Sequence, residues 1–284
     1  MDEIEKISII GAGTMGSGIA HVFAVNGYRV NLIDTSDDLL DKGFDSIKNY
    51  LGKQARKEII SRDKVENALE RISLSTDMNI ADDSQLLIEA VFENSEVKKK
   101  VFEELERISD SKVILATNTS SISITDIAAA TNRGDRVIGM HFFNPVPVME
   151  LVEIIRGKST GEDTYQVVRQ VVRSLGKTPV EVYDSPGFIS NRVLMPMINE
   201  AVFALMEGVS SADDIDTVMK LGMNHPMGPL RLADFIGLDV CLNIMEILQS
   251  GFNSDKYAPC PLLKEKVQLG ELGRKTGSGF YKYN

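Results

Sequence analysis

Short β-branched runs alternate with longer helical patterns over the first ~180 residues, and this alternation constrains the fold more than any other feature of the sequence. The predicted strands are Lys6–Ile10, Tyr28–Ile33, Ile72–Ser75, Leu86–Phe92, Val113–Asn118, Arg136–Phe142, Leu151–Ile155 and Pro179–Tyr183. The helices predicted between them are Ser17–Val25, Asp37–Lys57, Asp63–Arg71, Glu96–Ser109 and Glu162–Ser174. Short strands that alternate with helices predict βαβ units, and therefore an α/β domain with a mainly parallel sheet.

The pattern changes at the turn-forming segment Asp184–Gly187. Beyond it we find no convincing strand until the last few residues. The predicted helices there are Phe188–Gly208, Ala212–Leu221, Leu230–Gln249 and Leu262–Leu269. We therefore expect residues 1–184 to form the α/β domain and residues 185–284 an all-helical C-terminal domain. Clefts between two such domains are common ligand sites.

The charge balance argues against a nucleic-acid partner. Lys and Arg total 31 against 41 Asp and Glu, which gives a net charge of −10. An acidic chain repels a phosphate backbone unless it concentrates basic residues on one face. The longest basic run, Lys98–Lys100, is expected to lie on a solvated helix face.

Cysteine usage and hydropathy favour a soluble, cytoplasmic protein. Cys241 and Cys260 are too few for a disulfide framework and lack the paired spacing of a zinc site, so we predict no metal. One bridge between them stays open. The opening segment Met1–Lys6 has no basic n-region, and no apolar run reaches the ~18 residues of a membrane span.

A glycine motif, Gly11–Gly16 (Gly-Ala-Gly-Thr-Met-Gly), follows the first predicted strand and opens a helix. Gly11 permits a tight turn, Gly13 lets the backbone approach a pyrophosphate, and Gly16 lets helix and strand pack closely. The helix N-terminus then offers N–H groups and a positive dipole end to phosphates. The motif predicts a dinucleotide site on a Rossmann-type sheet.

Asp34 ends the next strand, 18 residues after Gly16. Its carboxylate can accept hydrogen bonds from an adenosine ribose and would repel a 2′-phosphate, which favours NAD over NADP. NADP stays possible because Thr35 and Ser36 could reach a phosphate. The alternative is an ordinary glycine turn followed by an Asp that caps a helix.

Alcohol oxidation by a nicotinamide enzyme needs a base for the hydroxyl proton, and histidine is the usual choice. His21 lies on a packing face of the first helix, and His225 lies in a loop, so both are expected to be structural. His141 ends a strand of the α/β domain, where ligands bind. It is the best candidate base, with a satisfied core histidine as the alternative.

A catalytic imidazole usually needs an acid to fix its tautomer. Glu150 and Glu153 lie in or beside the next strand, and their odd separation puts them on opposite faces. Both faces carry apolar neighbours, so alternation does not choose between them.

Four segments together resemble the L-3-hydroxyacyl-CoA dehydrogenases. They are Ala116–Ser121 (ATNTSS), Val137–Met149 (VIGMHFFNPVPVM), Asp184–Arg192 (DSPGFISNR) and Lys275–Tyr281 (KTGSGFY). The resemblance runs essentially end to end in the same order. The length is that of the form without a fused hydratase. Within the family, the chain is most similar to the short bacterial 3-hydroxybutyryl-CoA dehydrogenases.

The resemblance implies roles for four residues. His141 would be the general base in alcohol oxidation or the acid in ketone reduction, and Glu153 would be its orienting carboxylate. Ser120 would bind the substrate oxygen on C3, close to the nicotinamide. Asn191 would hold and polarise a substrate oxygen. From the residues alone, Ser120 and Asn191 would be interpreted as helix caps.

The resemblance also implies contacts with NAD beyond the glycine motif. These residues are Met15 (through its backbone N–H), Glu93, Lys98, Asn118, Ser120, Asn144 and Lys275. As bare sequence features, the side chain of Met15 indicates packing, and Glu93 and Lys98 indicate solvated charges beside a helix start.

Acetoacetyl-CoA or 3-hydroxybutyryl-CoA would bring phosphates to an acidic protein. Lys53, Arg56 and Lys57 are spaced to share one helix face, which we propose as the coenzyme A phosphate site. Lys57 matches the family position best, whereas Tyr50 stands where the family has a serine. The alternative is a solvated basic face.

The predicted helix Phe188–Gly208 is apolar on several faces and contains Pro196, which should kink it. We therefore expect a homodimer through the helical domain, as the resemblance also implies. Two other functions stay open. One is a lysine-type β-hydroxyacid dehydrogenase that acts on free acids, and the other is a non-catalytic nucleotide-binding relative.

Overall fold

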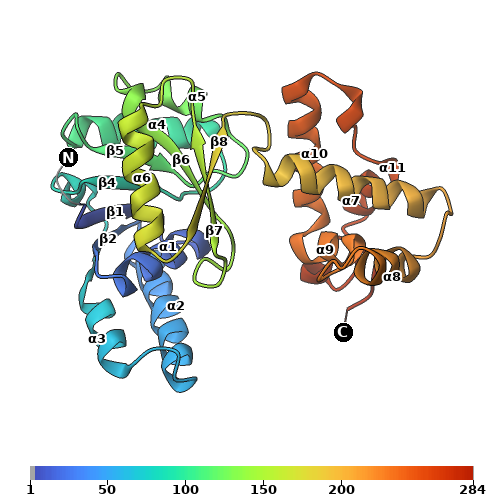
Figure 1. Ribbon diagram of the computed structural model, residues 1–284, viewed down its shortest axis with the longest axis horizontal. Helices are drawn as coiled ribbons and strands as arrows, with labels where there is room; N and C mark the ends of the chain where they lie inside the picture. The colour runs from blue at the N-terminus through green and yellow to red at the C-terminus, as the bar shows by residue number, and fades with distance from the viewer. Residues whose placement is uncertain (1–3, 284) are drawn as a thin grey trace. The chain divides into compact units, whose positions relative to one another are not determined.

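The computed structural model describes residues 4–283, and the chain divides into two units, Met1–Asp184 and Ser185–Asn284. Each unit has its own hydrophobic core. The first three residues of the opening segment lie outside the described residues. Figure 1 shows a sheet flanked by helices in the first unit and only helices packed together in the second.

The first unit is built on one eight-stranded sheet in the order β3-β2-β1-β4-β5-β6-β7-β8. Neighbouring strands are parallel except β6 and β7, which are antiparallel. The predicted α/β class with a mainly parallel sheet is confirmed. The strands are β1 (Lys6–Ile10), β2 (Arg29–Ile33), β3 (Ile72–Ser75), β4 (Leu86–Glu89), β5 (Ile114–Thr117), β6 (Val137–Phe142), β7 (Leu151–Arg156) and β8 (Thr178–Tyr183).

One strand ends three residues earlier than the sequence indicates. β4 was expected to reach Phe92 but ends at Glu89. The reason is local, because the backbone N–H of Val91 donates to the Glu89 side chain at 2.7 Å instead of continuing the ladder. The chain therefore turns away from the sheet directly after an acidic residue.

Helices cover both the sheet and one another in the first unit. The contacts join α1 to β1, β2 and α2, and α6 to β6, β7 and β8, and Figure 1 shows α6 crossing the sheet. The short α5, which packs against β6, was not predicted because five residues give too little periodicity to detect. The helices are α1 (Thr14–Val25), α2 (Asp37–Arg56), α3 (Arg62–Glu70), α4 (Ser95–Ile108), α5 (Ile124–Ala128) and α6 (Glu162–Ser174), with 3₁₀ turns η1 (Met78–Ala81) and η2 (Gly134–Arg136).

Over residues 185–283, the second unit packs five helices around a second core. They are α7 (Ser190–Met206), α8 (Ala212–Gly222), α9 (Pro229–Ile236), α10 (Leu238–Phe252) and α11 (Pro261–Gln268), with 3₁₀ turns η3 (Asp255–Tyr257) and η4 (Arg274–Thr276). The single helix predicted over Leu230–Gln249 is wrong. Gly237 has φ = +108°, a conformation that no helix contains, and it separates α9 from α10. Helix α7 continues through Pro196.

Three further predictions concern a strand in the last few residues, a disulfide bridge and membrane-spanning helices. The strand expected in the last few residues is absent from the described part of that segment, where Ser278 forms only isolated bridges with Gly273 and Lys282. Cys241 and Cys260 are both free and buried, so no bridge joins them. Among residues 4–283, no helix combines the length and the apolar character needed to span a bilayer.

Candidate active site

The carboxyl ends of the central strands bring together segments that are distant in the sequence. In the sheet, Ile10 of β1 pairs with Glu89 of β4, and Glu89 pairs with Thr117 of β5. Thr117 in turn pairs with Gly139 of β6. We call this region the carboxyl edge. Ligands of open parallel sheets bind at this edge.

The glycine motif forms a cradle between β1 and α1. Gly11 has φ = +106°, and a Cβ there would lie 2.6 Å from the Ala90 carbonyl oxygen. A Cβ on Gly16 would lie 1.7 Å from the Gly11 carbonyl oxygen, so both positions require glycine. At Gly13, by contrast, a Cβ would meet nothing within 4 Å. Gly13 caps α1 without a side-chain hydrogen bond, so the cradle leaves open space and uncapped N–H groups, which suits a phosphate.

Asp34 lies beside this cradle. Its Oδ2 accepts a hydrogen bond from the Ala12 backbone N–H at 2.6 Å, and its Oδ1 accepts from the Thr35 backbone N–H at 2.6 Å. The alternative that Asp34 caps a helix is wrong, because α2 is capped by Ser36, whose hydroxyl accepts from the Leu39 N–H. The acid is thus joined to the glycine turn rather than to α2.

His141 and Glu153 meet across the antiparallel pair β6–β7. They are direct register partners, and His141 Nδ1 lies 2.8 Å from Glu153 Oε2. Both side chains are buried, with 10% and 2% exposure. Glu150 is exposed before β7 begins. The strand register therefore makes the choice between the two acids that alternation leaves open.

Glu93 gathers the segment that follows β5. Its Oε1 accepts hydrogen bonds from the Thr119 hydroxyl at 2.5 Å and from the backbone N–H groups of Ser120 and Ser121 at 2.9 and 3.1 Å. The hydroxyls of Ser120 and Ser121 also donate to this oxygen. Partial burial works to raise the pKa of Glu93, but the Lys98 ammonium and these hydrogen bonds outweigh it and lower that pKa. Glu93 therefore stays ionised.

Lys98 is fully buried, which corrects its expected place on a solvated helix face. Its Nζ lies 2.7 Å from Glu89 Oε1 and 3.4 Å from Glu93 Oε2. Lys99 is partly exposed and Lys100 is exposed, so only the other two lysines of the run face outward. One buried ammonium is therefore shared between two carboxylates.

Asn118 connects β5 to the strand that carries His141. Its side-chain Oδ1 accepts a hydrogen bond from the Phe142 backbone N–H at 2.9 Å. Its own backbone N–H donates to the Glu89 carbonyl at 2.8 Å. The end of β6 is thus tied to the ends of β4 and β5.

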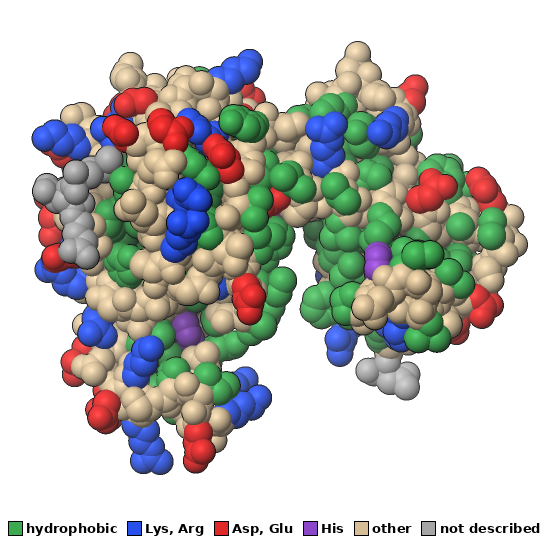
Figure 2. Space-filling view, viewed as in Figure 1, with side chains coloured by type: hydrophobic (Ala, Val, Ile, Leu, Met, Phe, Trp, Pro, Cys, Tyr) green, Lys and Arg blue, Asp and Glu red, His purple; other side chains and the backbone are tan. Residues whose placement is uncertain are grey.

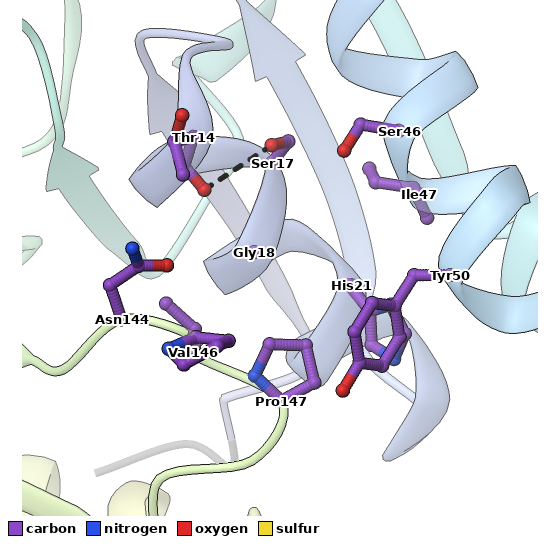
Figure 3. Close-up of a pocket in the computed structure, with 11 residues that line it drawn as sticks. Thr14, Ser17, Gly18, His21, Ser46, Ile47, Tyr50, Asn144, Val146 and Pro147 are labelled. Atoms are coloured by element: carbon purple, nitrogen blue, oxygen red, sulfur yellow. Dashed lines mark hydrogen bonds between the residues drawn. The ribbon is translucent and has the colours of Figure 1, made fainter. Parts of the chain in front are cut away.

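Asn144 and Tyr50 line a pocket of about 110 Å³ beside α1 and α2. Figure 3 shows Asn144, Val146 and Pro147 on the segment after β6, opposite Ser46, Ile47 and Tyr50 of α2. A Cβ on Gly18 would come within 3.0 Å of Val146, so this glycine allows the segment to approach α1 closely.

Lys177 also holds the segment that follows β6. Its buried Nζ donates to the carbonyl oxygens of Val146 and Met149 at 2.7 and 2.6 Å. Burial lowers the pKa of this ammonium, although Glu150 opposes the shift.

His21 and His225 lie where the sequence predicts them, on a packed helix face and in a loop. His21 is buried on α1, and its ring meets Tyr50 edge to face at 5.2 Å between centroids. His225 lies in the loop after α8 and is partly exposed. Within residues 4–283, no three His, Cys, Asp or Glu side chains gather in a way that could hold a metal ion.

The predicted basic face is exposed at the C-terminal end of α2. Lys53, Arg56 and Lys57 are all solvent-exposed there, and Lys57 is the C-cap. This geometry suits either a phosphate or solvent.

Two predicted residues belong to the helical unit. Asn191 is buried in the first turn of α7. Lys275 lies in η4, where its Nζ is 2.6 Å from Asp239 Oδ1. The structure therefore gathers the other predicted site residues in the first unit, and it describes these two within the second.

Three buried polar residues at the carboxyl edge were not among the predicted site residues: Glu89, Thr117 and Thr119. Glu89 ends the apolar run Leu86–Ile88, as Asp34 follows Leu32–Ile33. An acid that closes a buried strand must find a partner, and this signal could have identified it.

Comparison with known proteins gives one consistent result. A family model described as "3-hydroxyacyl-CoA dehydrogenase, NAD binding domain" matches residues 6–185, and the "C-terminal domain" of the same family matches residues 187–283. The chain is 52% identical over 281 residues to a probable 3-hydroxybutyryl-CoA dehydrogenase of Bacillus subtilis, covering 99% of this chain and 98% of that protein. It is 42% identical to the human mitochondrial hydroxyacyl-coenzyme A dehydrogenase, covering 99% and 91%.

The solved structures agree. The crystal structure of an (S)-3-hydroxybutyryl-CoA dehydrogenase from Ralstonia eutropha superimposes with a TM-score of 0.98 at 48% identity, covering 99% of this chain and 100% of that one.

Proposed function

We propose that this chain, which belongs to the 3-hydroxyacyl-CoA dehydrogenase family, interconverts L-3-hydroxybutyryl-CoA and acetoacetyl-CoA with NAD. The observation that carries the proposal is the 2.8 Å contact between His141 Nδ1 and Glu153 Oε2 at the carboxyl edge. Full-length relatives named 3-hydroxybutyryl-CoA dehydrogenase favour this function over a free-acid dehydrogenase or a non-catalytic relative.

The His141–Glu153 pair accounts for the proton. With Nδ1 held by Glu153, the imidazole takes the hydroxyl proton on Nε2 during oxidation and returns it during ketone reduction. Glu153 fixes the tautomer and stabilises the imidazolium that forms. NAD, when bound, accepts the hydride from C3, so one hydride and one proton leave the alcohol.

The cofactor-binding residues fit a dinucleotide. Gly11, Gly13 and Gly16 leave room for a pyrophosphate at the N-terminus of α1, where the N–H of Met15 is one of the donors. Asp34 would accept hydrogen bonds from the adenosine ribose. Toward the nicotinamide end we assign Glu93, Lys98, Asn118, Ser120, Asn144 and Lys275.

Ser120 and Asn191 would bind the substrate oxygen that gains negative charge. A hydroxyl and an amide aimed at a developing oxyanion are each worth a few kcal/mol. Ser120 lies in the segment organised by Glu93, and Asn191 would come from the helical unit.

The direct test is oxidation of NADH at 340 nm with acetoacetyl-CoA. We expect turnover with this thioester and much less with free acetoacetate. NADPH in place of NADH decides the cofactor, and longer 3-ketoacyl-CoAs decide the chain-length preference. Activity with the free acid but not the thioester, or NADH binding without turnover, would reject the proposal.

Lys53 and Lys57 on α2 would bind the coenzyme A phosphates, together with Arg56. Lys57→Ala should raise KM for acetoacetyl-CoA by about 3–10-fold, because an exposed ion pair is worth about 1 kcal/mol. The Kd for NADH should not change. Lys64→Ala on the neighbouring α3 is the matched control, and equal loss of both affinities in Lys57→Ala would count against the site.

The chain would act as a cytoplasmic homodimer joined through the helical unit. Figure 2 shows hydrophobic side chains at the surface of this unit, and Val193, Val209 and Leu221 are 66%, 72% and 81% exposed. Large hydrophobic side chains left this exposed support association between copies. Light scattering at micromolar protein should give twice the chain mass of 31.3 kDa, and a monomer mass would refute the dimer.

A further inference from the structure

Glu89 is a buried acid at the centre of the sheet. It ends β4, it is 0% exposed, and it lies between Ile10 of β1 and Thr117 of β5. Taking a carboxylate out of water is strongly unfavourable unless charges and hydrogen bonds replace the water. Its partners therefore show what this acid is placed to hold.

Three donors from three segments converge on the Glu89 carboxylate. Lys98 Nζ of α4 lies 2.7 Å from Oε1, and the Val91 backbone N–H donates to the same oxygen at 2.7 Å. The Thr117 hydroxyl of β5 donates to Oε2 at 2.6 Å. Both oxygens are thus engaged, and α4, β5 and the segment after β4 are fixed together.

Two of these contacts lead to the proposed nicotinamide end. Lys98 also reaches Glu93 Oε2 at 3.4 Å, and the other Glu93 oxygen organises residues 119–121. Thr117 precedes Asn118, whose side chain holds the Phe142 N–H beside His141. Glu89 is therefore connected through Lys98 to Glu93 and through Thr117 to Asn118, which are both assigned to the nicotinamide end.

The Lys98 ammonium also lies closer to one of its two carboxylates than to the other. Lys98 makes its short contact with Glu89 and its long contact with Glu93. A buried ammonium that lost Glu89 would move toward the remaining carboxylate, because an unpaired buried charge is unstable. Glu93 would then be tied up by a closer ammonium and would accept a hydroxyl less well.

We propose that Glu89 is a positioning residue for hydride transfer, which draws Lys98 inward so that the Glu93 oxygens stay open to hydrogen bonds and the Ser120 segment keeps its place. The inference rests on the proposed function, because it assigns Glu93 and Ser120 to the cofactor and substrate. Glu89 itself touches neither.

The test is a double-mutant cycle between Glu89→Gln and Lys98→Met. NADH Kd is measured by fluorescence titration, and kcat/KM for NADH by acetoacetyl-CoA reduction. Glu89→Gln should weaken NADH binding about 10-fold and lower kcat/KM for NADH by about 10–100-fold, whereas KM for acetoacetyl-CoA changes less than about 3-fold. In the Lys98→Met background, the same substitution should change NADH Kd by less than about 3-fold, because its effect passes through Lys98.

A second variant covers the case in which Glu89→Gln does not fold. Thr117→Val removes the hydroxyl that donates to Glu89 and accepts from the Thr119 backbone N–H, and it should give the same losses at smaller size. Thr164→Val is the matched control, since it removes a buried hydroxyl that donates to Asp135 before β6 begins. It should leave NADH Kd and kcat unchanged.

Wild-type NADH affinity in folded Glu89→Gln, or an equal loss with and without Lys98, would overturn the inference. If Glu89→Gln does not fold, wild-type NADH Kd in Thr117→Val overturns it. The titration needs no acyl-CoA. A wild-type enzyme inactive on acetoacetyl-CoA would therefore reject the proposed function independently of the NADH cycle.

Discussion

The two units bury carboxylates in different ways. In the α/β unit, Glu89 and Glu153 face a lysine ammonium and an imidazole, namely Lys98 and His141. In the helical unit, the equally buried Asp216 and Asp234 form none of the ion pairs found among residues 4–283. Burial of an acid therefore does not by itself indicate a catalytic site.

Within residues 4–283, these two acids of the helical unit accept from backbone N–H groups and tyrosine hydroxyls and from no lysine or histidine. Asp216 accepts from the backbone N–H groups of Leu230 and Arg231 and from the Tyr281 hydroxyl. Asp234 accepts from two backbone N–H groups of the C-terminal segment and from the Tyr283 hydroxyl. These acids fasten the C-terminal segment to α8 and α9. The type of donor therefore separates an acid that holds the fold together from one that faces an ammonium or an imidazole.

The largest effect should come from His141 and Glu153, the pair proposed to exchange a proton. His141→Gln should lower kcat by about 10²–10⁴-fold, because the amide cannot act as acid or base near neutral pH. NADH Kd by fluorescence titration should stay near wild type. His225→Gln, in the loop after α8, is the matched control, and a kcat above one tenth of wild type in His141→Gln would break the comparison.

Unlike His141, His21 should respond to pH through the stability of the fold and not through catalysis. Burial lowers the pKa of His21 to about 4, with a smaller opposing effect from Gln54. Between pH 6.5 and pH 4 the unfolded chain binds the proton that the folded chain excludes. The free energy of unfolding should therefore fall as the pH falls, by up to ~3 kcal/mol.

Urea unfolding between pH 7 and pH 4 measures this His21 effect. His21→Gln should flatten the acid branch of the stability curve relative to wild type, and His225→Gln should leave it unchanged. An unaltered acid branch in His21→Gln would show that the buried imidazole does not contribute.

Removing the charge of a structural acid should cost stability and spare the chemistry. Asp234→Asn leaves one acceptor oxygen for three donors and should lower the free energy of unfolding by about 1–3 kcal/mol. Urea denaturation measures the loss, and Asp255→Asn at an exposed position is the control. A lower kcat in the folded Asp234→Asn protein would instead group Asp234 with Glu89 and Glu153.

The smallest effect should appear at alkaline pH. Partial burial and the hydrogen bond to Asp234 raise the pKa of Tyr283 to about 12. Between pH 10 and pH 12 the unfolded chain releases a proton that the folded chain retains, so stability should fall as the pH rises. Tyr283→Phe should remove this part of the alkaline loss in urea unfolding, whereas the exposed Tyr183→Phe should retain it.

Much of the fold was predictable because its signals are local. All eight strands were found from short apolar runs, and the glycine motif located the turn between β1 and α1. Errors arose where one side chain or one backbone angle overrode periodicity. Gly237 divides a helix that apolar spacing joins, and Glu89 ends β4 by accepting the Val91 N–H.

The candidate site was less accessible, because its partners are distant in the chain. Three consecutive lysines look solvated, yet Lys98 is buried because Glu89, nine positions earlier, ends the neighbouring strand. Only the antiparallel register of β6 and β7 sets His141 opposite Glu153. The C-terminal residues that donate to Asp234 lie 46 or more residues further along the chain.

The sequence by itself determined which segments form strands and helices, where phosphates can approach α1, and which residue types are available for proton transfer. Strand register and helix packing decided which acid meets which donor. The physical reason is range: periodicity and turn chemistry act over a few residues, whereas burial of a charge depends on partners that only the folded chain brings within 3 Å.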